Sequence, residues 1–464
     1  MVIHTTPSMS IHLVGIGGIG MSGIAEVLIS MGFKVTGSDL SRSQNTQKLE
    51  KLGAKIFIGH QAENINEANL IVVSSAINQQ NPEILKAKDQ RIPIMRRAEM
   101  LAELMRLKQG IAVGGTHGKT TTTSLLATIL KEADFDPTYI IGGVVNNLNG
   151  HARVGTGEFL IAEADESDGT FLFLNPVYSI ITNIDNDHVD HYGSEEKLIE
   201  AFENFANQVP FYGVCALNAH DPKLAEIHKK MKKPSITFGI EGTKSYMDID
   251  IEAKNIIYAL DKTTFDLYIA QKLVTKIEVS IPGAHNVLNS LGAIAIAHHL
   301  GLSAEKLAKG VSCFKGVGRR FQTLYDKNDL LVIDDYGHHP TEIQATLETA
   351  LNIAGNRKII VIFEPHRFSR TRDCWDGFLH CFNCANKVYL GPIYGASESP
   401  IVGIDSHRMG EDINQLHPNL VENIESMEKI DEIIESYKNE HAMILTLGAG
   451  SIGREVRRWL NSTK

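Results

Sequence analysis

Cysteine is scarce in this sequence. Five cysteines in 464 residues, an odd number, are too few for a framework of disulfide bonds. Cys381 and Cys384 form a CxxC pair, but no second pair stands at zinc-finger spacing, and the segment has the pattern of a helix. We therefore expect reduced thiols and an ordinary packed helix at this position rather than a zinc site.

Long apolar runs are also missing, and the charge is mild. No stretch approaches the roughly 20 apolar residues of a membrane span, and the first residues lack the basic and apolar regions of a signal peptide. A formal net charge of −10 over this length argues against a general nucleic-acid binder. We expect a cytoplasmic protein with no membrane span and no nucleic-acid partner.

The composition is that of a globular protein, with 43% apolar and 22% charged residues, and the length suits about three domains. Apolar strands alternate with helical segments through most of the chain, which indicates the α/β class. We predict a Rossmann-like doubly wound sheet in residues 1–108, a P-loop ATPase sheet in 109–315, and a Rossmann-like domain in 316–464. Residues 248–281 alternate apolar and polar with period 2, which predicts a small antiparallel insertion in the central domain.

A glycine-rich turn at residues 114–121 is the strongest functional signal. It follows an apolar run and precedes helix-forming residues, so it joins a strand to a helix N-terminus, where backbone N–H groups and the helix dipole favour phosphate. Lys119 is expected to reach the β/γ-phosphates of a nucleotide, and Thr120 to ligate Mg²⁺. The loop, GTHGKT, is shorter than the common P-loop, because Val113 stands where the first glycine is expected.

Acidic side chains follow two further predicted strands. Glu163 and its neighbours end one strand, and an Asp-rich segment with His188 ends the next. The carboxyl ends of neighbouring parallel strands open onto one crevice, so these groups are expected beside the phosphate loop, where they suit Mg²⁺. Zinc fits less well, because thiolates and an HExxH spacing are missing.

Two other segments allow more than one interpretation. Residues 15–20 form GxGxxG between a strand and a helix, with Asp39 at the spacing of a ribose ligand, which fits NAD and a sugar-nucleotide diphosphate equally well. His366, Arg367 and Arg370 follow a predicted strand and could hold a carboxylate bidentately, or form a surface basic patch.

Two phosphate-type loops about 100 residues apart indicate two phosphorylated ligands. If a carboxylate approaches the γ-phosphate of ATP, two unit charges about 4 Å apart repel by roughly 4 kcal/mol at an effective dielectric near 20. Lys119 and divalent ions would offset this repulsion. The residues alone therefore predict an ATP-dependent ligase or kinase with an anionic partner.

Eleven segments, taken together and in this order, resemble the Mur ligase family over essentially the whole chain. They are GIGGIGMSGIAEVL (15–28), SSAI (74–77), RRAEML (96–101), GGTHGKTTTT (114–123), EADESDGTF (163–171), TNIDNDHVDHYG (182–193), PGAHNVLN (282–289), GRRF (318–321), DDYGHHP (334–340), EPHRFSRTRD (364–373) and GAGSIG (448–453).

The resemblance implies that the three domains bind a UDP-sugar, ATP and an amino acid, in that order. It implies a carbon–nitrogen ligase of peptidoglycan precursor synthesis that joins L-alanine to the lactyl carboxylate of UDP-N-acetylmuramate through an acyl phosphate. ATP would be the co-substrate and Mg²⁺, or Mn²⁺, the cofactor, in a monomer or homodimer.

The resemblance also implies roles for individual residues. The catalytic residues would be Lys119, Glu163 and His188, and the metal ligands Thr120, Glu163 and His188. The ATP site would comprise Gly115, Thr116, His117, Gly118, Lys119, Thr120, Thr121, His285, Asn286, Asn289, Arg320 and Asp335. The amino-acid site would comprise Tyr336, His338, His366, Arg367 and Arg370, and the UDP-sugar site Gly18, Asp39, Ser75 and Arg97.

Three alternatives stay open. A murein tripeptide ligase would use the same sugar nucleotide with a different amine. An NAD-dependent oxidoreductase would use the first glycine loop and leave Lys119 and Glu163 without a role. A P-loop regulatory protein would hydrolyse ATP without any amine.

Overall fold

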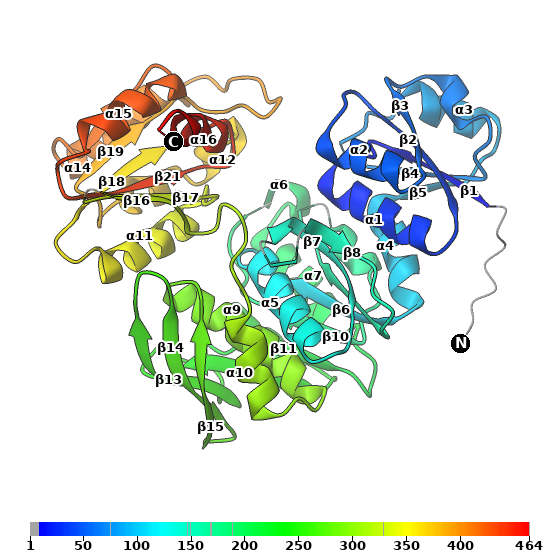
Figure 1. The fold of residues 1–464 in the computed structure, drawn as a ribbon, viewed down its shortest axis with the longest axis horizontal. Helices are drawn as coiled ribbons and strands as arrows, with labels where there is room; N and C mark the ends of the chain where they lie inside the picture. The colour runs from blue at the N-terminus through cyan, green and yellow to red at the C-terminus, as the bar shows by residue number, and fades with distance from the viewer. Residues whose placement is uncertain are drawn as a thin grey trace. The chain divides into compact units, whose positions relative to one another are not determined.

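The computed structural model describes residues 9–463, apart from Ser75, Asn146, Asn149, Asp168, His188, Asn328 and the side chains of residues 144, 189 and 190. The chain divides into two compact units (Figure 1). The first comprises Met1–Lys254, Asp266–Ile277 and Leu288–Phe314, and the second Asn255–Phe265, Glu278–Val287 and Lys315–Lys464. Three separate sheets follow one another along the chain, and helices alternate with their strands, which confirms the predicted α/β fold class.

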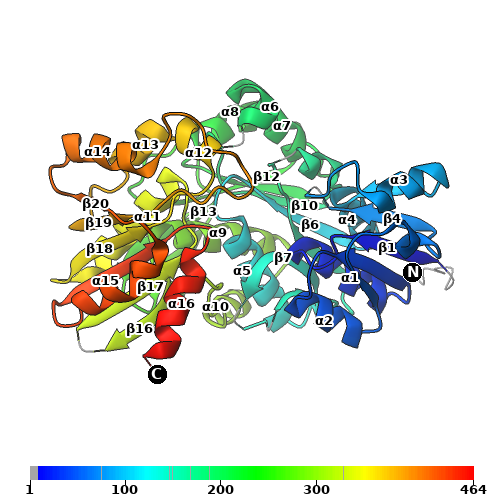
Figure 2. The ribbon, with the colours of Figure 1, turned by 90° about the horizontal axis from the view of Figure 1, so that it is seen from above.

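The first sheet is parallel and has the strand order β3-β2-β1-β4-β5. Its strands are β1 (Ser10–Val14), β2 (Lys34–Asp39), β3 (Lys55–Ile58), β4 (Leu70–Val73) and β5 (Ile94–Arg96), and its helices α1 (Ile19–Ser30), α2 (Gln44–Lys51), η1 (Ala62–Ile65), α3 (Pro82–Asp89) and α4 (Arg97–Arg106). Ile11 and Leu13 pack towards α1, whereas Val14 and Ile71 pack towards α3. Figure 2 accordingly shows α3 on the opposite side of this sheet from α1 and α2.

The second sheet has ten strands in the order β15-β14-β13-β12-β11-β10-β6-β9-β7-β8. They are β6 (Gln109–Gly114), β7 (Thr138–Val145), β8 (Gly150–Arg153), β9 (Phe159–Glu163), β10 (Tyr178–Ile181), β11 (Val214–Asn218), β12 (Ser235–Ile240), β13 (Ile251–Tyr258), β14 (Thr263–Ile269) and β15 (Lys272–Val279). The helices are α5 (Lys119–Glu132), η2 (Thr170–Phe173), α6 (Val189–Tyr192), α7 (Glu195–Ala206), α8 (Pro222–Lys230), α9 (Ala284–His299) and α10 (Ala304–Ser312).

The order of strands in this second sheet positions the phosphate loop. Strand β6 lies between β10 and β9 and is parallel to both, so the segments that follow the three strands emerge at one edge, as predicted. Strands β13, β14 and β15 are joined by connections of four and two residues, too short for a parallel crossover. They form the predicted antiparallel insertion.

The third sheet has the order β16-β17-β21-β18-β19-β20, and only its edge strand β16 runs antiparallel. Its strands are β16 (Gln322–Lys327), β17 (Leu330–Asp335), β18 (Lys358–Phe363), β19 (Lys387–Leu390), β20 (Val421–Asn423) and β21 (Ala442–Leu447). Its helices are α11 (Pro340–Ala354), α12 (Phe368–Asp373), α13 (Trp375–His380), α14 (Ser406–Leu416), η3 (Met427–Lys429), α15 (Ile430–Ser436) and α16 (Ile452–Ser462).

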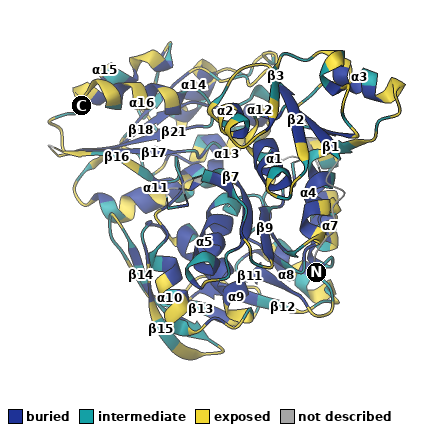
Figure 3. Ribbon diagram, turned by 45° about the vertical axis from the view of Figure 1, so that its right-hand side comes forward, coloured by how far each residue is buried: buried dark blue, intermediate teal, exposed yellow. Residues whose placement is uncertain are grey.

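Alternate residues of this third sheet enter two apolar cores. Leu330 and Val332 pack with α15 and α16, whereas Leu331 and Ile333 pack with α11, α13 and α14. Because both faces are covered, the central strands are buried along their length (Figure 3). This explains why they read in the sequence as uninterrupted apolar runs.

One local prediction was wrong. Cys381 and Cys384 lie in the turn after α13, which ends at His380, and not inside a helix. The chain has to reverse there, because β19 begins only a few residues later. All five cysteines are free. Within the described residues, no cysteine belongs to a group of three ligand-type side chains close enough to share a metal ion, and no helix is long and apolar enough to cross a membrane.

Candidate functional site

The phosphate loop joins β6 to α5, which confirms the predicted strand, turn and helix. Two glycines determine its course. Gly118, the N-cap of α5, has a left-handed φ of 83°. Gly115 has a φ of 125°, and a Cβ there would lie 2.1 Å from Thr182 Oγ1. The backbone therefore passes directly over the end of β10, where only glycine fits.

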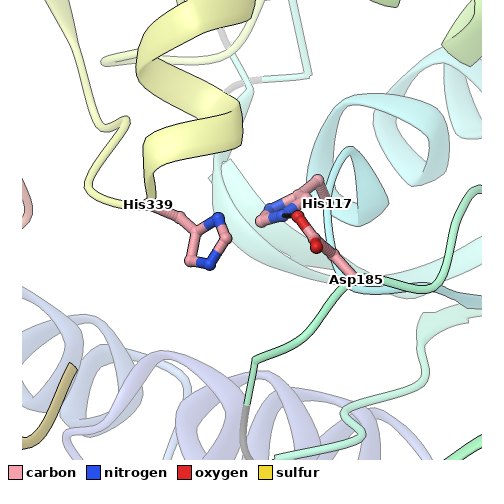
Figure 4. Close-up of side chains that lie close together, drawn as sticks. All are labelled: His117, Asp185 and His339. Atoms are coloured by element: carbon pink, nitrogen blue, oxygen red, sulfur yellow. Dashed lines mark hydrogen bonds and ion pairs between the residues drawn. The ribbon is translucent and has the colours of Figure 1, made fainter. Parts of the chain in front are cut away.

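Strand β10 also fixes the loop through hydrogen bonds. Thr116 N donates to Asn183 O (3.0 Å), and His117 N donates to Asn183 Oδ1 (2.9 Å). Asp185 N donates to Thr116 Oγ1 (2.9 Å), and His117 Nε2 lies 3.0 Å from Asp185 Oδ2 (Figure 4). The N–H groups of Thr116 and His117 are thus used to anchor the loop, although both residues were predicted to bind ATP.

Lys119, the first residue of α5, is held by an internal carboxylate. Its Nζ donates to both oxygens of Glu166 (2.9 and 2.7 Å) and to the carbonyls of Gly115 (2.7 Å) and Thr116 (3.1 Å). Burial disfavours the ammonium, but the neighbouring carboxylates of Glu166, Asp165 and Glu163 together outweigh burial and raise the pKa of Lys119. The lysine is therefore charged, and it lies in the loop that the sequence predicts to bind phosphate.

The predicted metal ligands Thr120 and Glu163 lie together. Thr120 Oγ1 donates to Glu163 Oε2 (3.1 Å), and Gly142 N donates to Glu163 Oε1 (2.6 Å). The Thr120 hydroxyl at the start of α5 and the Glu163 carboxylate at the end of β9 are hard oxygen donors, the kind that Mg²⁺ prefers, so the residues present fit this ion. His188, the third predicted ligand, lies outside the described residues.

The first glycine loop is organised around Asp39, at the end of β2. Gly17 N donates to Asp39 Oδ2 (2.9 Å), and Gly18 is the N-cap of α1. Arg97 lies against the loop, because a Cβ on Gly20 would be 2.9 Å from its Nη1. Three of the four residues predicted for the UDP-sugar therefore surround one loop, and the fourth, Ser75, lies outside the described residues.

Arg97 also connects this first glycine loop to the central sheet. Its Nη2 donates to Asp165 Oδ2 (3.2 Å), two residues after Glu163. Burial opposes the charge of Asp165, but Lys119, Ser167 and Arg97 outweigh it and lower the pKa of this carboxyl. In the acidic segment after β9, the Asp165 carboxylate thus binds Arg97, and the carboxylate of the next residue, Glu166, binds Lys119.

The residues predicted on α9 fall into two groups. Asn289 lies at the phosphate loop, where Thr122 Oγ1 donates to its Oδ1 (3.2 Å) and a Cβ on Gly118 would be 2.4 Å from that atom. Asn286 donates to the Pro282 carbonyl (2.7 Å). Burial, reinforced by Arg320, lowers the pKa of His285 to about 4, so this imidazole is neutral at pH 7.

In the second unit, Asp335 at the end of β17 shapes two turns. Its Oδ2 accepts from Phe321 N and its Oδ1 from Gly337 N, both at 2.7 Å, and burial raises its pKa.

The Arg320 guanidinium lies over the Tyr336 ring, 5.2 Å from the centroid. Arg320 also forms an ion pair with Glu342 (3.6 Å), whose carboxylate accepts from His338 N (3.0 Å).

Three predicted amino-acid-site residues contact one another in the same unit. The rings of His338 and His366 meet edge to face (5.8 Å between centroids), and Arg370 Nη1 lies 3.5 Å from His366 Nδ1. Burial, together with the nearby His338 and arginines, lowers the pKa of His366 to about 4. Arg367 differs, because its Nε binds Glu398 Oε1 (2.6 Å).

In the glycine-rich segment at residues 448–453, the side chain of Glu364 takes the place beside the backbone where a ligand could bind. Glu364 accepts from Ser451 Oγ (2.6 Å) and from Ile452 N at the start of α16 (2.9 Å). A Cβ on Gly450 would lie 2.5 Å from Glu364 Oε2. The helix N-terminus thus neutralises an internal carboxylate that comes directly before the turn carrying His366.

Sequence reasoning did not identify four of the residues that organise these sites. Glu166 lay within a recognised acidic run, and Asn183 followed a recognised strand end, so a signal was available for both. Glu364 follows a predicted strand in the same way, at the start of the segment at residues 364–373. Glu398 had no such signal, because its partners are fixed only by the folded chain.

Family models match almost the entire chain. The Mur ligase family catalytic domain matches residues 10–109, the Mur ligase middle domain residues 113–297, and the Mur ligase glutamate ligase domain residues 319–450.

Full-length relatives carry a single name. The UDP-N-acetylmuramate–L-alanine ligase of Solidesulfovibrio magneticus is 45% identical over 454 residues, 98% of each chain. That of Geobacter sulfurreducens is 45% identical over 443 residues, 95% of each chain.

Solved structures resemble the chain over its full length. The UDP-N-acetylmuramate-alanine ligase MurC from Thermotoga maritima has a TM-score of 0.81 at 31% identity and covers 98% of this chain and 100% of its own. A murein peptide ligase from Psychrobacter arcticus has a TM-score of 0.69 at 26% identity and covers 98% of both chains.

Proposed function

This chain belongs to the Mur ligase family, and we propose that it forms the amide bond between L-alanine and the lactyl carboxylate of UDP-N-acetylmuramate while ATP is cleaved to ADP and phosphate. This is a step of peptidoglycan precursor synthesis, and we assign it to the cytoplasm. The observation that carries the proposal is the charged Lys119 in a glycine loop, beside the oxygen pair of Thr120 and Glu163, in a chain whose full-length relatives carry this name.

In the first half of the reaction, a lactyl carboxylate oxygen attacks the γ-phosphorus of ATP, and ADP leaves. The product is an acyl phosphate. Lys119 is positioned to hold the β- and γ-phosphates and to offset the repulsion between two anions. Gly118 and the N-terminus of α5 supply the dipole that favours phosphate at the same place.

A divalent ion, Mg²⁺ or Mn²⁺, would be held by Thr120 and Glu163, with His188 as a further ligand. When bound, it would neutralise phosphate charge during transfer. Thr120 and Glu163 already contact each other, so one ion could take an oxygen from each residue.

In the second half, the amine nitrogen of L-alanine attacks the carbonyl carbon, phosphate leaves, and the nitrogen loses a proton. We assign the amino acid to the second unit, with its carboxylate near Arg370 and His366. Because the pKa of His366 is lowered to about 4, this imidazole is uncharged at pH 7, which leaves Arg370 as the cation of that pair.

The first glycine loop is assigned to the UDP-sugar diphosphate. Gly18 is the N-cap of α1, Asp39 closes the loop, and Arg97 adds a cation beside it. An NAD-dependent oxidoreductase would use the same loop, but it offers no role for Lys119, Thr120 or Glu163.

The deciding experiment is a phosphate-release assay with ATP, Mg²⁺ and UDP-N-acetylmuramate, with and without L-alanine. The proposal predicts release that requires all three substrates and a product that is heavier by one alanine residue. If ATP is hydrolysed equally well without an amine, a regulatory ATPase is the better description. If murein tripeptide alone triggers release, the alternative murein tripeptide ligase is correct.

A further inference from the structure

The 364–370 turn, formed by the connection between β18 and α12 and by the first residues of α12, carries His366 and Arg370. It is held by a carboxylate from a distant loop. Glu398 Oε1 accepts from Arg367 Nε (2.6 Å) and Ser369 Oγ (2.7 Å), while its Oε2 accepts from Ser369 N (2.9 Å). Partial burial opposes the charge, but these bonds from Ser369 and Arg367 outweigh it and lower the pKa of Glu398 to about 2.

Both Arg367 and the loop that carries Glu398 have backbone with positive φ angles. Arg367 has a φ of 72°, and the loop that delivers Glu398 places two successive non-glycine residues in the left-handed region, Ala396 at 47° and Ser397 at 74°. Glu398 N donates to Gly395 O (2.8 Å) and closes this turn. Strained conformations of this kind persist only when surrounding contacts enforce them, and they concentrate at functional sites.

Tyr394 fastens the same loop to the turn a second time. Its ring is stacked on that of His366, with 5.6 Å between centroids and 11° between planes. Arg367 N donates to Tyr394 O and Tyr394 N donates to Pro365 O, both at 2.8 Å. The loop at residues 394–398 therefore contacts the turn at His366, Arg367 and Ser369. Arg370 Nη1 lies 3.5 Å from His366 Nδ1.

We propose that Glu398 is a positioning residue of the amino-acid site: by binding Arg367 and Ser369, it sets the turn that presents His366 and Arg370 to the carboxylate of the incoming amino acid. This rests on the proposed function. It gives Arg367 a different role from Arg370, although the two are equivalent in the sequence pattern. Arg367 belongs to the support of the site, and Arg370 to the substrate.

An ordinary surface ion pair is the competing explanation. Arg367 and Glu398 are 42% and 23% exposed, and ion pairs at such sites usually stabilise little. Glu398, however, makes two further hydrogen bonds to Ser369, so its loss releases the first turn of α12 and not only one guanidinium.

The test compares Glu398→Gln with Glu422→Gln. Glu422 forms an exposed ion pair with Lys387 (3.1 Å) on the edge strand β20, so its variant removes the same charge elsewhere in the same unit. For Glu398→Gln we expect the KM for the amino acid to rise about tenfold, the effect of losing roughly one charge-assisted hydrogen bond. The kcat and the KM for ATP should stay within about twofold of wild type, and Glu422→Gln should change neither constant.

A double-mutant cycle then separates the two roles of Arg367. If Glu398 acts through Arg367, then Arg367→Ala should raise the KM of the wild type but add little in a Glu398→Ala background. If Arg367 binds the substrate directly, the two effects multiply, and the inference is wrong. It is also wrong if Glu398→Gln behaves like Glu422→Gln, or if it lowers the melting temperature and kcat without a selective change in the amino-acid KM.

All KM values are measured with the amine that the wild type accepts. If this proves to be the murein tripeptide, the proposed function fails, while the selective effect of Glu398→Gln on the KM for that amine still decides the present inference.

Discussion

Lys119 is charged and already paired, so a nucleotide has to compete for it. Glu166 is 2% exposed and gives both carboxylate oxygens to the ammonium. The γ-phosphate of ATP would approach the same cation, and the Glu166 carboxylate would repel it. In the proposed function, Glu166 therefore weakens ATP binding.

Neutralising this carboxylate should tighten nucleotide binding. For Glu166→Gln we expect a Kd for ATP about three to ten times lower than that of the wild type, because the amide keeps an acceptor for Lys119 but removes the repulsion. Titration calorimetry with a non-hydrolysable ATP analogue measures the change. A Kd that rises instead would show that Glu166 supports the binding-competent lysine and does not oppose the phosphate.

At the scale of the element, the glycine loop depends on its close approach to β10. Gly115→Ala would place a Cβ 2.1 Å from Thr182 Oγ1 and 2.9 Å from Thr182 N, at a φ of 125°. We expect a loss of turnover of at least about 100-fold, since about 3 kcal/mol of lost positioning suffices for this change. The measurement is kcat by phosphate release, together with the melting temperature.

The matched control is Gly53→Ala. Gly53 has a φ of 104° and nothing within 4 Å of the added Cβ, so the substitution introduces the backbone strain without the clash. It should cost about 1–2 kcal/mol of stability and leave kcat unchanged. Equal losses of kcat in the two variants would mean that the course of the loop over β10 is unimportant.

The elements of this fold were largely predictable from the sequence, because buried parallel strands read as apolar runs followed by glycine or polar turns. Residues 358–363 are an example, and β18 spans the same residues. The contact between Thr120 and Glu163 was predictable for a related reason, since both residues follow neighbouring strands of one sheet.

The supporting contacts were not predictable. Lys119 meets Glu166 across 47 residues, and Arg367 meets Glu398 across 31. Neither partner stands at a helical or strand spacing from the other, and an acidic residue in a loop is more often solvated than paired. Such pairs depend on the path of loops, which local propensity does not determine.

At the scale of the molecule, two half-buried neutral histidines should make the second unit sensitive to acid. The pKa values of His285 and His366 are lowered to about 4 in the fold, against about 6.5 in the unfolded chain. Between these values the unfolded chain binds more protons, so stability is full above about pH 6.5 and is lost as the pH falls towards 4. Each histidine should contribute on the order of 1–2 kcal/mol to the loss between pH 7 and pH 5.

Urea unfolding at these two pH values measures this effect. His285→Asn should reduce the difference between them, whereas His407→Asn, at an exposed position on α14, should not. If His285→Asn leaves the difference unchanged, the fold does not hold this histidine in its neutral form.

The last prediction concerns the two glycine loops, which lie in separate sheets and are each assigned one ligand. In the part of the chain that the structure describes, the Lys119 ammonium donates hydrogen bonds to the phosphate loop and to Glu166, whereas Asp39 and Arg97 lie at a separate loop in the first sheet. Lys119→Ala should therefore abolish turnover and leave the Kd for UDP-N-acetylmuramate within about threefold of wild type, because no direct phosphate contact of that ligand is removed. Calorimetry with the sugar nucleotide measures the Kd, and Arg97→Ala is the contrasting variant, expected to weaken binding at least about tenfold by removing a cation from the diphosphate. One path between the two loops is the bond from Arg97 to Asp165, next to Glu166. If binding of the sugar nucleotide vanishes in Lys119→Ala, this path is strong enough to make the two loops a single site, and the assignment of one ligand to each sheet is wrong.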